Sequence, residues 1–543
     1  MVKVNSNKLI VYFAVTISLI FIPMNFDALI IPKMAILFAL ALYLLPELIS
    51  NIKILSKNRN SFLLIVVSLL IIIQMLVVAF TNSAPLEQQF FGRTGRGLGI
   101  ATYFSLLIVL ILMSGYSRVS DSGFILKWLG FAALISSLYA VMQREGIDLV
   151  TWNSKTNGII GTLGNPNFQS SFTAMALIPM LVYIWSQFSK FKYILISVCL
   201  VIFLLTLYFA QSTQGYVALA SASLVFTLIY SWYRSKTFFC LQAASGIIIG
   251  LIAIAGMINK GPLAEFLYKL SVQSRGDFWR AAFRTANSNP FFGTGIDSFG
   301  DSFLIYRDRV NIEMTDNAHN YFLEFAATGG YVLALLYLII GIFTLYSFFS
   351  LQRKINKFDM RLAAIFSAWL VFLLQAVISP GTIVLLLWNV VLSGYLIGSN
   401  IQYLSEVKKL DSNLTSLKQE KKFASLLLFI IGLLIMFPLF KSDVELKKAA
   451  SAGDVQSLMS ALTSYPESSV KYNIFTQELL KSGLFPQALE MGHSAVTFNS
   501  NAVSGWALIF VNPQAPLSER LKAKIEILRL DPMNTEVNGF KLG

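Results

Sequence analysis

The feature that most limits the fold of this chain is a series of apolar runs, each close to the length that crosses a bilayer. A membrane-spanning helix needs about 20 predominantly apolar residues, and thirteen such runs can be recognised. They lie near residues 9–24, 29–50, 61–80, 100–115, 124–142, 168–187, 193–211, 215–232, 238–257, 321–348, 362–379, 381–398 and 423–440. Charged residues make up only 13% of the sequence, whereas soluble proteins average about 25%. The sequence therefore predicts an all-α, polytopic helical membrane protein with thirteen crossings.

Lysine and arginine residues mark one side of the predicted bundle. They cluster around residues 3–8, 53–59, 118, 190–192, 234–236, 353–361 and 408–422, in every second loop. Cytoplasmic loops carry such an excess, so we expect the N-terminus and these loops in the cytoplasm. The loops at 81–99, 143–167 and 258–320 then face outward from the cytoplasmic (inner) membrane. This orientation signal accounts for the net charge of +14, which therefore does not indicate nucleic acid as a partner.

Residues 441–543, called the tail below, have the composition of a soluble helical segment. Three turn-like sites, Tyr465-Pro466, Asn499-Ser500 and Asp531-Pro532, divide it at intervals of 34 and 32 residues. Tetratricopeptide repeats, which are paired helices of about 34 residues, have this period. We therefore predict two domains, a membrane domain over 1–440 and a helical-hairpin repeat (TPR-like) domain over 441–543. An odd number of crossings puts the tail outside the cell, where its repeats would bind a partner protein; an unrelated small helical domain is the alternative.

One of only two histidines in the chain, His319, lies where the loop 258–320 enters the apolar run from Phe325. A group that titrates near neutral pH at a membrane boundary is a candidate for proton transfer. The positive end of a helix dipole disfavours an imidazolium there, so we expect a neutral His319 that can accept a proton. Simple capping of the helix start is the structural alternative.

Arginines in the outer loops are candidates for anion binding. Arg93 and Arg96 lie among glycines, where backbone N–H groups also reach an anion. Arg275, Trp279 and Arg280 lie together in the long loop. The planar guanidinium matches phosphate oxygens, and Trp279 is suited to stack on a sugar or a prenyl chain. A flexible loop and an amphipathic interfacial helix are the respective alternatives.

Amide side chains in another outer loop are candidates for substrate contact. Asn165 and Asn167 flank Pro166 in a turn just before the run at 168–187. Such a turn projects amides and caps the next helix. Sugar recognition and capping therefore both stay open.

These segments occur in the order typical of one family. His319-Asn320, followed after nine residues by Gly330, resembles the signature of the O-antigen ligase / O-antigen polymerase superfamily. The run Ser274-Arg275…Trp279…Asn289-Pro290…Gly293-Thr-Gly295 resembles that family's long periplasmic loop, and Pro32-Lys33 and Gly164-Asn-Pro-Asn167 are similar as well. The similarity covers residues 10–400. One departure is Gln214, which stands where the family often has an arginine.

The resemblance implies a glycosyltransferase that works at the outer face of the cytoplasmic membrane. It would transfer a glycan from a polyprenyl-diphosphate carrier to the hydroxyl of an acceptor, which is a glycolipid, a polymer or a protein. An O-antigen-type polymerase and a protein O-oligosaccharyltransferase share this donor chemistry and are the alternatives within the family.

The resemblance also implies roles for individual residues. The catalytic pair would be His319, which either acts as general base or orients the acceptor hydroxyl by hydrogen bonding, and Asn320. The donor diphosphate would be bound by Arg275, Arg93, Arg96 and Arg280. Substrate or the imidazole would be positioned by Gln214, Asn165, Asn167, Trp279 and Glu324. No Asp-x-Asp motif or carboxylate cluster lies in the outer loops, so we expect no metal and no other cofactor, with arginines stabilising the leaving group.

Two function classes outside the family also fit a basic polytopic protein. A solute or lipid transporter would normally carry ionisable residues in the middle of the membrane, where these apolar runs are nearly free of charge. A scaffold without catalysis would not need His319 or the arginines. Both classes are therefore weaker readings of the sequence than an enzyme.

Overall fold

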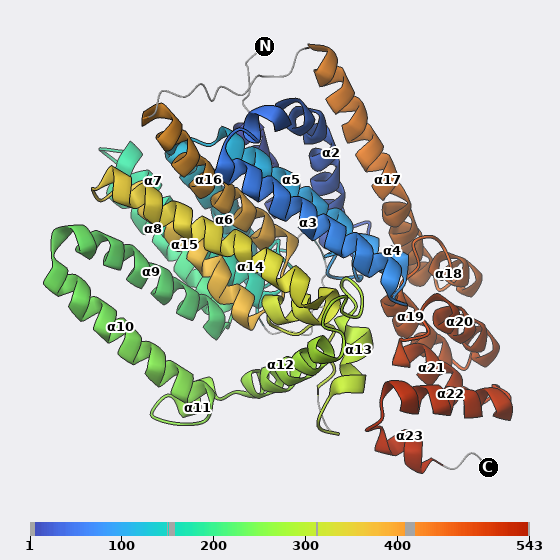
Figure 1. Cartoon of the computed structure of the whole chain (residues 1–543). Coiled ribbons are helices and arrows are strands. Elements are labelled where there is room, and N and C mark those ends of the chain that lie inside the picture. The colour runs from blue at the N-terminus through green and yellow to red at the C-terminus, as the bar shows by residue number, and fades with distance from the viewer. Residues whose placement is uncertain (1–5, 149, 151–157, 311–312, 408–418, 541–543) are drawn as a thin grey trace.

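The computed structural model describes residues 6–148, 150, 158–310, 313–407 and 419–540, and this part is built from helices without strands (Figure 1). Eleven helical segments in it are long and apolar enough to cross a membrane. They contain α2 (Ile30–Leu55), α3 (Arg59–Thr81), α6 (Ser122–Arg144), α7 (Pro166–Gln187), α8 (Lys192–Phe209), α9 (Thr213–Arg234), α10 (Lys236–Met257), α14 (Tyr321–Ile355), α15 (Met360–Ile378), α16 (Ile383–Val407) and α17 (Gln419–Ala452). Two shorter apolar helices, α1 (Ser6–Leu19) and α5 (Ile100–Tyr116), occupy the remaining predicted runs. The predicted fold class, a polytopic helical membrane protein, is confirmed.

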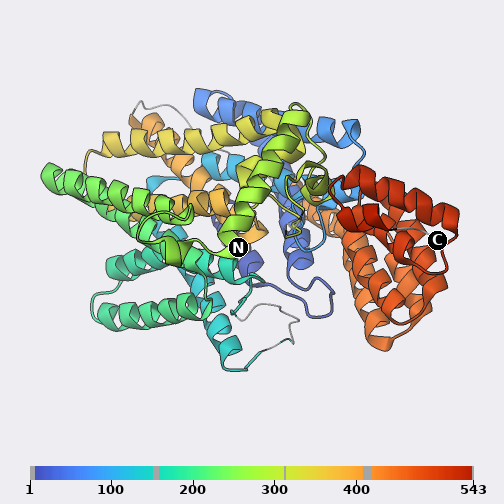
Figure 2. The same cartoon turned by 90° about the horizontal axis from the view of Figure 1, so that it is seen from below.

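The polar segments form helices of their own. The loops that the sequence predicts on the outer side contain α4 (Leu86–Phe91), α11 (Ala264–Leu267), α12 (Leu270–Ser288) and α13 (Phe299–Tyr306). The tail forms α18 (Val455–Leu462), α19 (Ser469–Lys481), α20 (Phe485–Phe498), α21 (Val503–Val511), α22 (Leu517–Leu530) and α23 (Thr535–Gly539). Figure 2 shows the tail packed beside the membrane helices, and α17 runs without a break through residue 441 to reach it. The two-domain division and the repeat assignment stay predictions.

Helix α16 forms the centre of the bundle. Every residue in the most apolar window of its span Ile383–Tyr403 is buried. Two buried indoles, one in α16 and one in α15, find hydroxyl partners: Trp388 Nε1 donates to Ser18 Oγ at 2.9 Å and Trp369 Nε1 to Ser393 Oγ at 2.8 Å. An indole N–H without a partner in an apolar interior would be costly. At the periphery, by contrast, no residue in the most apolar window of α10 is buried, and Figure 1 shows α10 standing at the side of the bundle.

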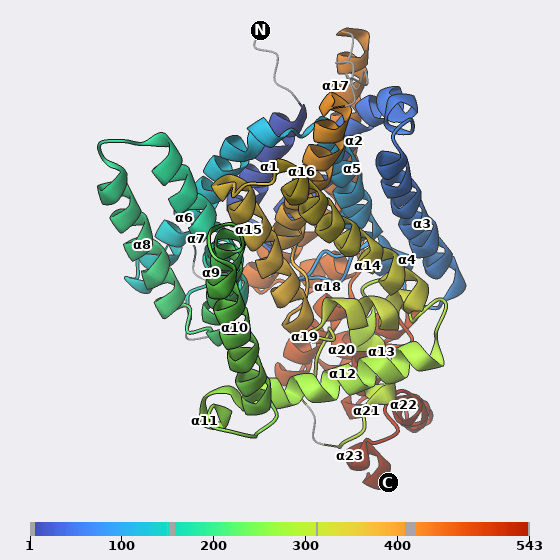
Figure 3. The same cartoon turned by 60° about the vertical axis from the view of Figure 1, so that its left-hand side comes forward.

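The two ends of the bundle differ. At one end the start of α1 meets the junction of α5 and α6, where Asn7 Nδ2 donates to Asp121 Oδ2 at 2.9 Å. Arg118 and Lys357, from two of the basic loops, line one cavity at this end. Helices α11–α13 and the tail lie at the opposite end (Figures 1 and 3). This separation matches the predicted alternation of basic loops and long polar loops along the chain. Which end faces the cytoplasm, and on which side of the membrane the tail lies, stay predictions.

Helix α14 is broken at Gly330, the glycine of the His-Asn signature. Gly330 has φ +79°, a left-handed conformation inside the helix, which a residue with a Cβ rarely adopts. A Cβ at this position would also overlap the backbone of Phe291. The break therefore requires glycine for two independent reasons.

The segment that follows α12 fills this break. Tyr331 N donates to Pro290 O at 2.8 Å, and Thr294 N donates to Ala327 O at 3.1 Å. From α3, Gln74 Nε2 donates to the carbonyl oxygens of Phe291 and Gly329 at 2.6 and 3.0 Å. Backbone groups away from water need such partners. The Asn-Pro…Gly-Thr-Gly segment and the glycine of α14 thus form one packing unit.

We expect the substitution Gly330→Ala to destabilise the protein strongly, since a backbone region that essentially only glycine occupies (φ +79°, ψ 167°) costs about 1–3 kcal/mol and the overlap with Phe291 adds to it. Gly341→Ala, in the same helix but with nothing within 4 Å of its Cβ, is the matched control and should be neutral or slightly stabilising. Thermal unfolding in detergent measures both. Equal melting temperatures for the two variants would contradict the conclusion that the break at Gly330 and the segment after α12 pack as one unit.

Candidate functional site

Helix α12 presents three side chains to His319. Phe278 and Trp279 follow Arg275 by three and four residues, which puts all three on one side of a helix. The Phe278 ring stacks on the imidazole, with centroids 5.3 Å apart and planes at 29°. Trp279 Nε1 donates to the carbonyl oxygen of His319 at 3.4 Å. Helix α12 therefore contacts both the ring and the backbone of His319.

His319 lies in a strained turn just before α14. Its φ is +48°, and such conformations in residues other than glycine gather at functional sites. Asn317 Oδ1 stabilises the turn by accepting from His319 N at 3.0 Å. Asn320 caps the helix, since its Oδ1 accepts from Phe322 N and Leu323 N, both at 3.1 Å. Asn320, rather than His319, thus performs the capping that the sequence left open.

The imidazole of His319 is neutral at pH 7. Burial is the main cause that lowers the pKa of His319 to about 4; the charge of Arg275 also lowers it, while Asp316 opposes. The Nδ1 atom is buried and has no hydrogen-bond partner among the residues that the structure describes. A neutral imidazole carries one nitrogen that accepts a proton. The arrangement therefore leaves His319 available for proton transfer with a bound molecule.

The guanidinium of Arg96 is buried among carboxylates. It pairs with Glu324 at 2.5 Å and with Asp297 at 3.3 Å, and its side chain is 9% exposed. Arg96 Nη1 also donates to the backbone oxygen of Asp316 at 2.9 Å. Burial lowers the pKa of Arg96, but Asp297, Glu324 and Asp316 raise it overall. Arg96 thus stays charged and joins four segments around His319.

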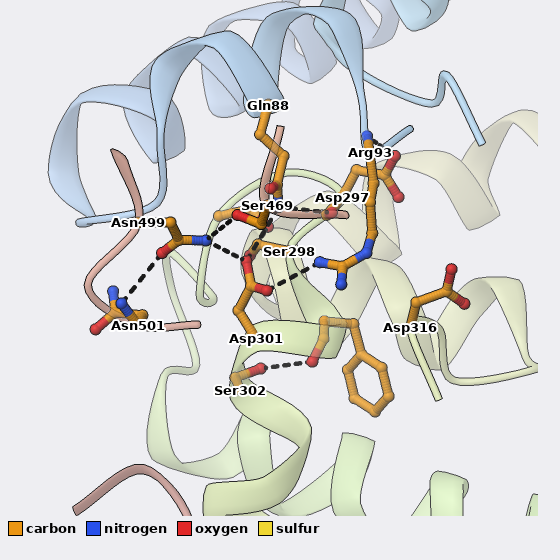
Figure 4. Close-up of polar contacts among 12 residues, drawn as sticks. Gln88, Arg93, Asp297, Ser298, Asp301, Ser302, Asp316, Ser469, Asn499 and Asn501 are labelled. Carbon is orange, nitrogen blue, oxygen red and sulfur yellow. Dashed lines mark hydrogen bonds and ion pairs between the residues drawn. The ribbon is translucent and has the colours of Figure 1, made fainter. Parts of the chain in front are cut away.

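Arg93 is paired in a similar way. Its Nη1 lies 2.9 Å from Asp301 Oδ1, and its backbone N donates to Asp297 Oδ2 at 2.7 Å (Figure 4). The expectation that Arg93 and Arg96 bind the donor diphosphate did not foresee this pairing. Their carboxylate partners lie far away in the sequence and gather only on folding. Glu324, expected near the imidazole, has Arg96 as its charged partner instead.

Arg275, in contrast, forms no ion pair within the described structure. Its Nε donates to Ile378 O at 2.8 Å and its Nη1 to Ser271 O at 2.9 Å. Two neutral carbonyl groups therefore orient the guanidinium. Burial lowers the pKa of Arg275, against the influence of Glu313, yet an arginine stays protonated in proteins. Its positive charge remains available to an anion.

Arg275 lines a cavity of about 640 Å³ between α9, α10 and α12. Lys269, Arg280 and Arg309 also line it, against a single acidic residue, Asp277. Asp277 pairs with Arg280 and, at 3.6 Å, with Arg309, whereas Arg275 and Lys269 form no ion pair in the described part of the chain. Apolar side chains of the α10–α11 region form the remaining wall: Met257, Ile258, Phe266 and Leu267. The cavity combines positive charge with an apolar surface.

Other predicted residues lie at the same cavity. Trp279, Gln214 and Asn167 are among its lining residues. Gln214 Nε2 donates to Ser171 Oγ at 3.2 Å, and Asn167 Oδ1 accepts from Ser212 Oγ at 2.7 Å. Asn165 is not a lining residue; it caps α7 by accepting from Asn167 N at 2.8 Å. The structure thus brings Arg275, Arg280, Trp279, Gln214 and Asn167 together at this cavity.

Sequence reasoning missed Lys269 and the acidic partners Asp297 and Asp301. Lys269 stands directly before α12, and no spacing links it to the other basic residues. The near balance of acidic and basic residues in the loop 258–320 is the one signal that indicates paired charges. Over the described ranges, no group of three His, Cys, Asp or Glu residues is arranged to hold a metal ion. Independence from metal stays a prediction.

The predicted turns of the tail all contact the membrane part. Near the first turn, Glu467 N donates to Glu87 Oε2 at 2.7 Å. At the second, Asn499 Nδ2 donates to Asp301 Oδ2 at 3.0 Å (Figure 4). At the third, Asp531 accepts from Arg307 in two hydrogen bonds of 2.9 Å. One edge of the tail is therefore docked next to the candidate site.

We expect Arg96→Ala to cost about 3–5 kcal/mol of folding free energy, because Glu324 and Asp297 would stay buried without their cation. The matched control is Arg309→Ala, whose side chain is 66% exposed and should contribute less than about 1 kcal/mol. Thermal unfolding and protein levels in membranes provide the measurement. Two equally stable variants would refute the structural role of Arg96.

The Arg307–Asp531 pair, with side chains 8% and 4% exposed, tests the docking of the tail. Either Arg307→Asp or Asp531→Arg alone should release the tail, because each leaves like charges buried together. Limited proteolysis would then cut the tail faster than in the wild type. The double variant restores opposite charges and should regain protection; failure of that rescue would count against the pair as the anchor.

Comparison with known families covers the part of the chain that holds His319 and α12, but not Arg96 or Asn167. Residues 198–338 match the family described as O-antigen ligase. No curated protein matches the chain. The matched residues begin in α8 and end in α14, so they include α12 with Arg275, and His319. This match supports the superfamily that the sequence resembles, a ligase- and polymerase-type family of glycosyltransferases.

Proposed function

We propose that this protein transfers a glycan from a polyprenyl-diphosphate carrier to an acceptor hydroxyl at the outer face of the cytoplasmic membrane. The observation that supports it best is the juxtaposition of His319 and Arg275. A neutral, strained histidine with an unpartnered Nδ1 packs against helix α12, which also carries an arginine without a carboxylate partner among the described residues. Proton transfer and anion binding are the two functions that such a reaction requires.

The cavity of about 640 Å³ suits a prenyl-diphosphate donor. Arg275 and Lys269 provide positive charge for the diphosphate, with Arg280 and Arg309 at the same wall. Met257, Phe266 and their neighbours offer an apolar surface for the first part of the prenyl chain. Since α10 is unburied along its apolar window, a lipid tail can reach this wall from the bilayer.

In the proposed reaction, the imidazole of His319 takes the proton of the acceptor hydroxyl. The hydroxyl oxygen forms a bond to the anomeric carbon of the donor, and the bond between that carbon and the diphosphate oxygen breaks. The prenyl diphosphate leaves as an anion, which Arg275 and Lys269 stabilise. Asn320 and Trp279 act as positioning residues, because they hold the helix start and the backbone at His319.

Glycan transfer in a deletion strain tests this proposal. With membrane levels matched, His319→Ala should lower transfer about 10²–10⁴-fold, the usual range for loss of a general base, and Arg275→Ala should also lower it. Lipid-linked glycan should accumulate in both strains. The controls are His493→Ala, which removes the other histidine, on the exposed tail surface, and Arg529→Ala, in the tail, whose side chain is 51% exposed. Unchanged surface glycans with both test variants would leave a transporter or a scaffold as the better explanation.

The pH dependence of kcat/KM tests the protonation state of His319. A base with a pKa of about 4 is almost fully neutral between about pH 6 and 8, so kcat/KM should stay nearly constant over that range. The value of kcat/KM should fall only as the pH approaches that pKa. Arg275→Gln removes a positive charge that lowers the pKa, so the acid limb should move to higher pH. An acid limb near the ordinary histidine pKa of about 6.5 in the wild type would contradict the burial of this imidazole.

A further inference from the structure

A second cavity, of about 660 Å³, lies between the membrane helices and the tail. The end of α3, the segment after α12, and α13 line it from one side. Asn499 and Asn501 of the tail line it from the other (Figure 4). None of the residues proposed for donor binding or proton transfer is among its lining residues. This cavity therefore differs from the one that holds Arg275.

The walls of this second cavity are polar but carry no free charge. Most lining side chains are amides and hydroxyls, among them Asn82, Ser288, Asn289, Tyr306 and Asn501. Among the described lining residues, the one carboxylate, Asp301, pairs with Arg93 at 2.9 Å, and there is no lysine or arginine. The rings of Phe291 and Phe292, which are 64% and 46% exposed, add apolar surface.

This composition selects a class of ligand. Amides and hydroxyls both donate and accept hydrogen bonds, as the hydroxyl groups of a sugar do, and exposed aromatic rings pack against the C–H faces of sugar rings. A phosphate would find no cation here. A lipid tail would bury these amides without partners, at a cost in free energy. An uncharged saccharide satisfies both the polar and the aromatic parts of the wall.

Helix α12 connects the two cavities. Arg275 lies near its start and Ser288 at its end, and a rise of 1.5 Å per residue places them about 20 Å apart. A glycan of several sugars can extend over such a distance from a reacting end near His319. The tail completes the second cavity, because Asn501 Nδ2 donates to Ser83 Oγ of the α3–α4 connection at 2.7 Å.

We propose that the cavity between the membrane helices and the tail binds an uncharged, hydroxyl-rich stretch of glycan, away from the reacting end. This inference rests on the proposed transfer function. The bound stretch belongs either to the donor glycan or to a glycan acceptor, which share this chemistry. In both cases the tail contributes directly to substrate binding, in addition to any partner protein that it holds.

The test uses the full-length protein in nanodiscs and two variants. Ser288→Trp fills the cavity from an exposed position at the end of α12, and Asn501→Ala removes a lining amide. Gln477→Trp, on an exposed surface of α19, is the control for an added indole. The binding probe is the soluble glycan released from the lipid carrier, followed by ligand-observed NMR. Wild type and control should bind it, and both test variants should bind at least about tenfold more weakly, as expected for loss of about 1.4 kcal/mol of contacts.

Steady-state kinetics with long and short glycan chains on the donor and on the acceptor identify which of these two substrates supplies the bound stretch. A higher KM for the lipid-linked donor assigns the cavity to the donor glycan, and a higher KM for the acceptor assigns it to the acceptor; either supports the proposal. Wild-type binding and KM values in both folded variants would overturn it, as would a wild type that does not bind the released glycan. Arg275→Ala should still bind the released glycan, so failure of the transfer proposal and failure of this site give different results.

Discussion

The buried guanidinium of Arg96 is the interaction on which the candidate site depends. It pairs with Asp297 after α12 and with Glu324 in the first turn of α14, and it donates to the backbone of Asp316. These contacts fix both sides of the turn that contains His319. A strained residue keeps its conformation only where its surroundings over-determine it. The left-handed backbone of His319, and with it the direction of the imidazole, therefore depends on the buried cation of Arg96, which lies far from His319 in the sequence.

The contacts of the docked tail also connect to these buried charges. Its turn sites recur at intervals of 34 and 32 residues, and the repeat of paired helices that this spacing predicts would bring each turn to the same edge of the stack. That edge meets Glu87, Asp301 and Arg307 in order. Asp301 also pairs with Arg93, so the tail is connected to the charged residues that surround the candidate site. The position of the tail and the arrangement of the site are thus parts of one network.

Much of the fold followed from the sequence, because spans of apolar residues in a bilayer have few alternatives to helices. His319 and Arg275 belong to the same loop in the sequence, and the structure places both of them at the interface between α12 and the start of α14. The pairing of Arg93 and Arg96 was not predicted, since residues 96 and 324 lie far apart in the chain and local spacing does not report such contacts. The neutral state of His319 was argued from a helix dipole, whereas burial and Arg275 are its causes in the structure. Lys269 gave no local signal.

Single-turnover transfer by the purified protein in nanodiscs, with lipid-linked glycan and acceptor, tests the central claim most directly. The comparison is between wild type and His319→Gln, with donor binding measured separately for each. If His319 is the base, the variant binds donor as tightly as wild type, while the rate of the chemical step falls at least about 100-fold. A variant that transfers glycan at the wild-type rate would contradict the assignment of His319.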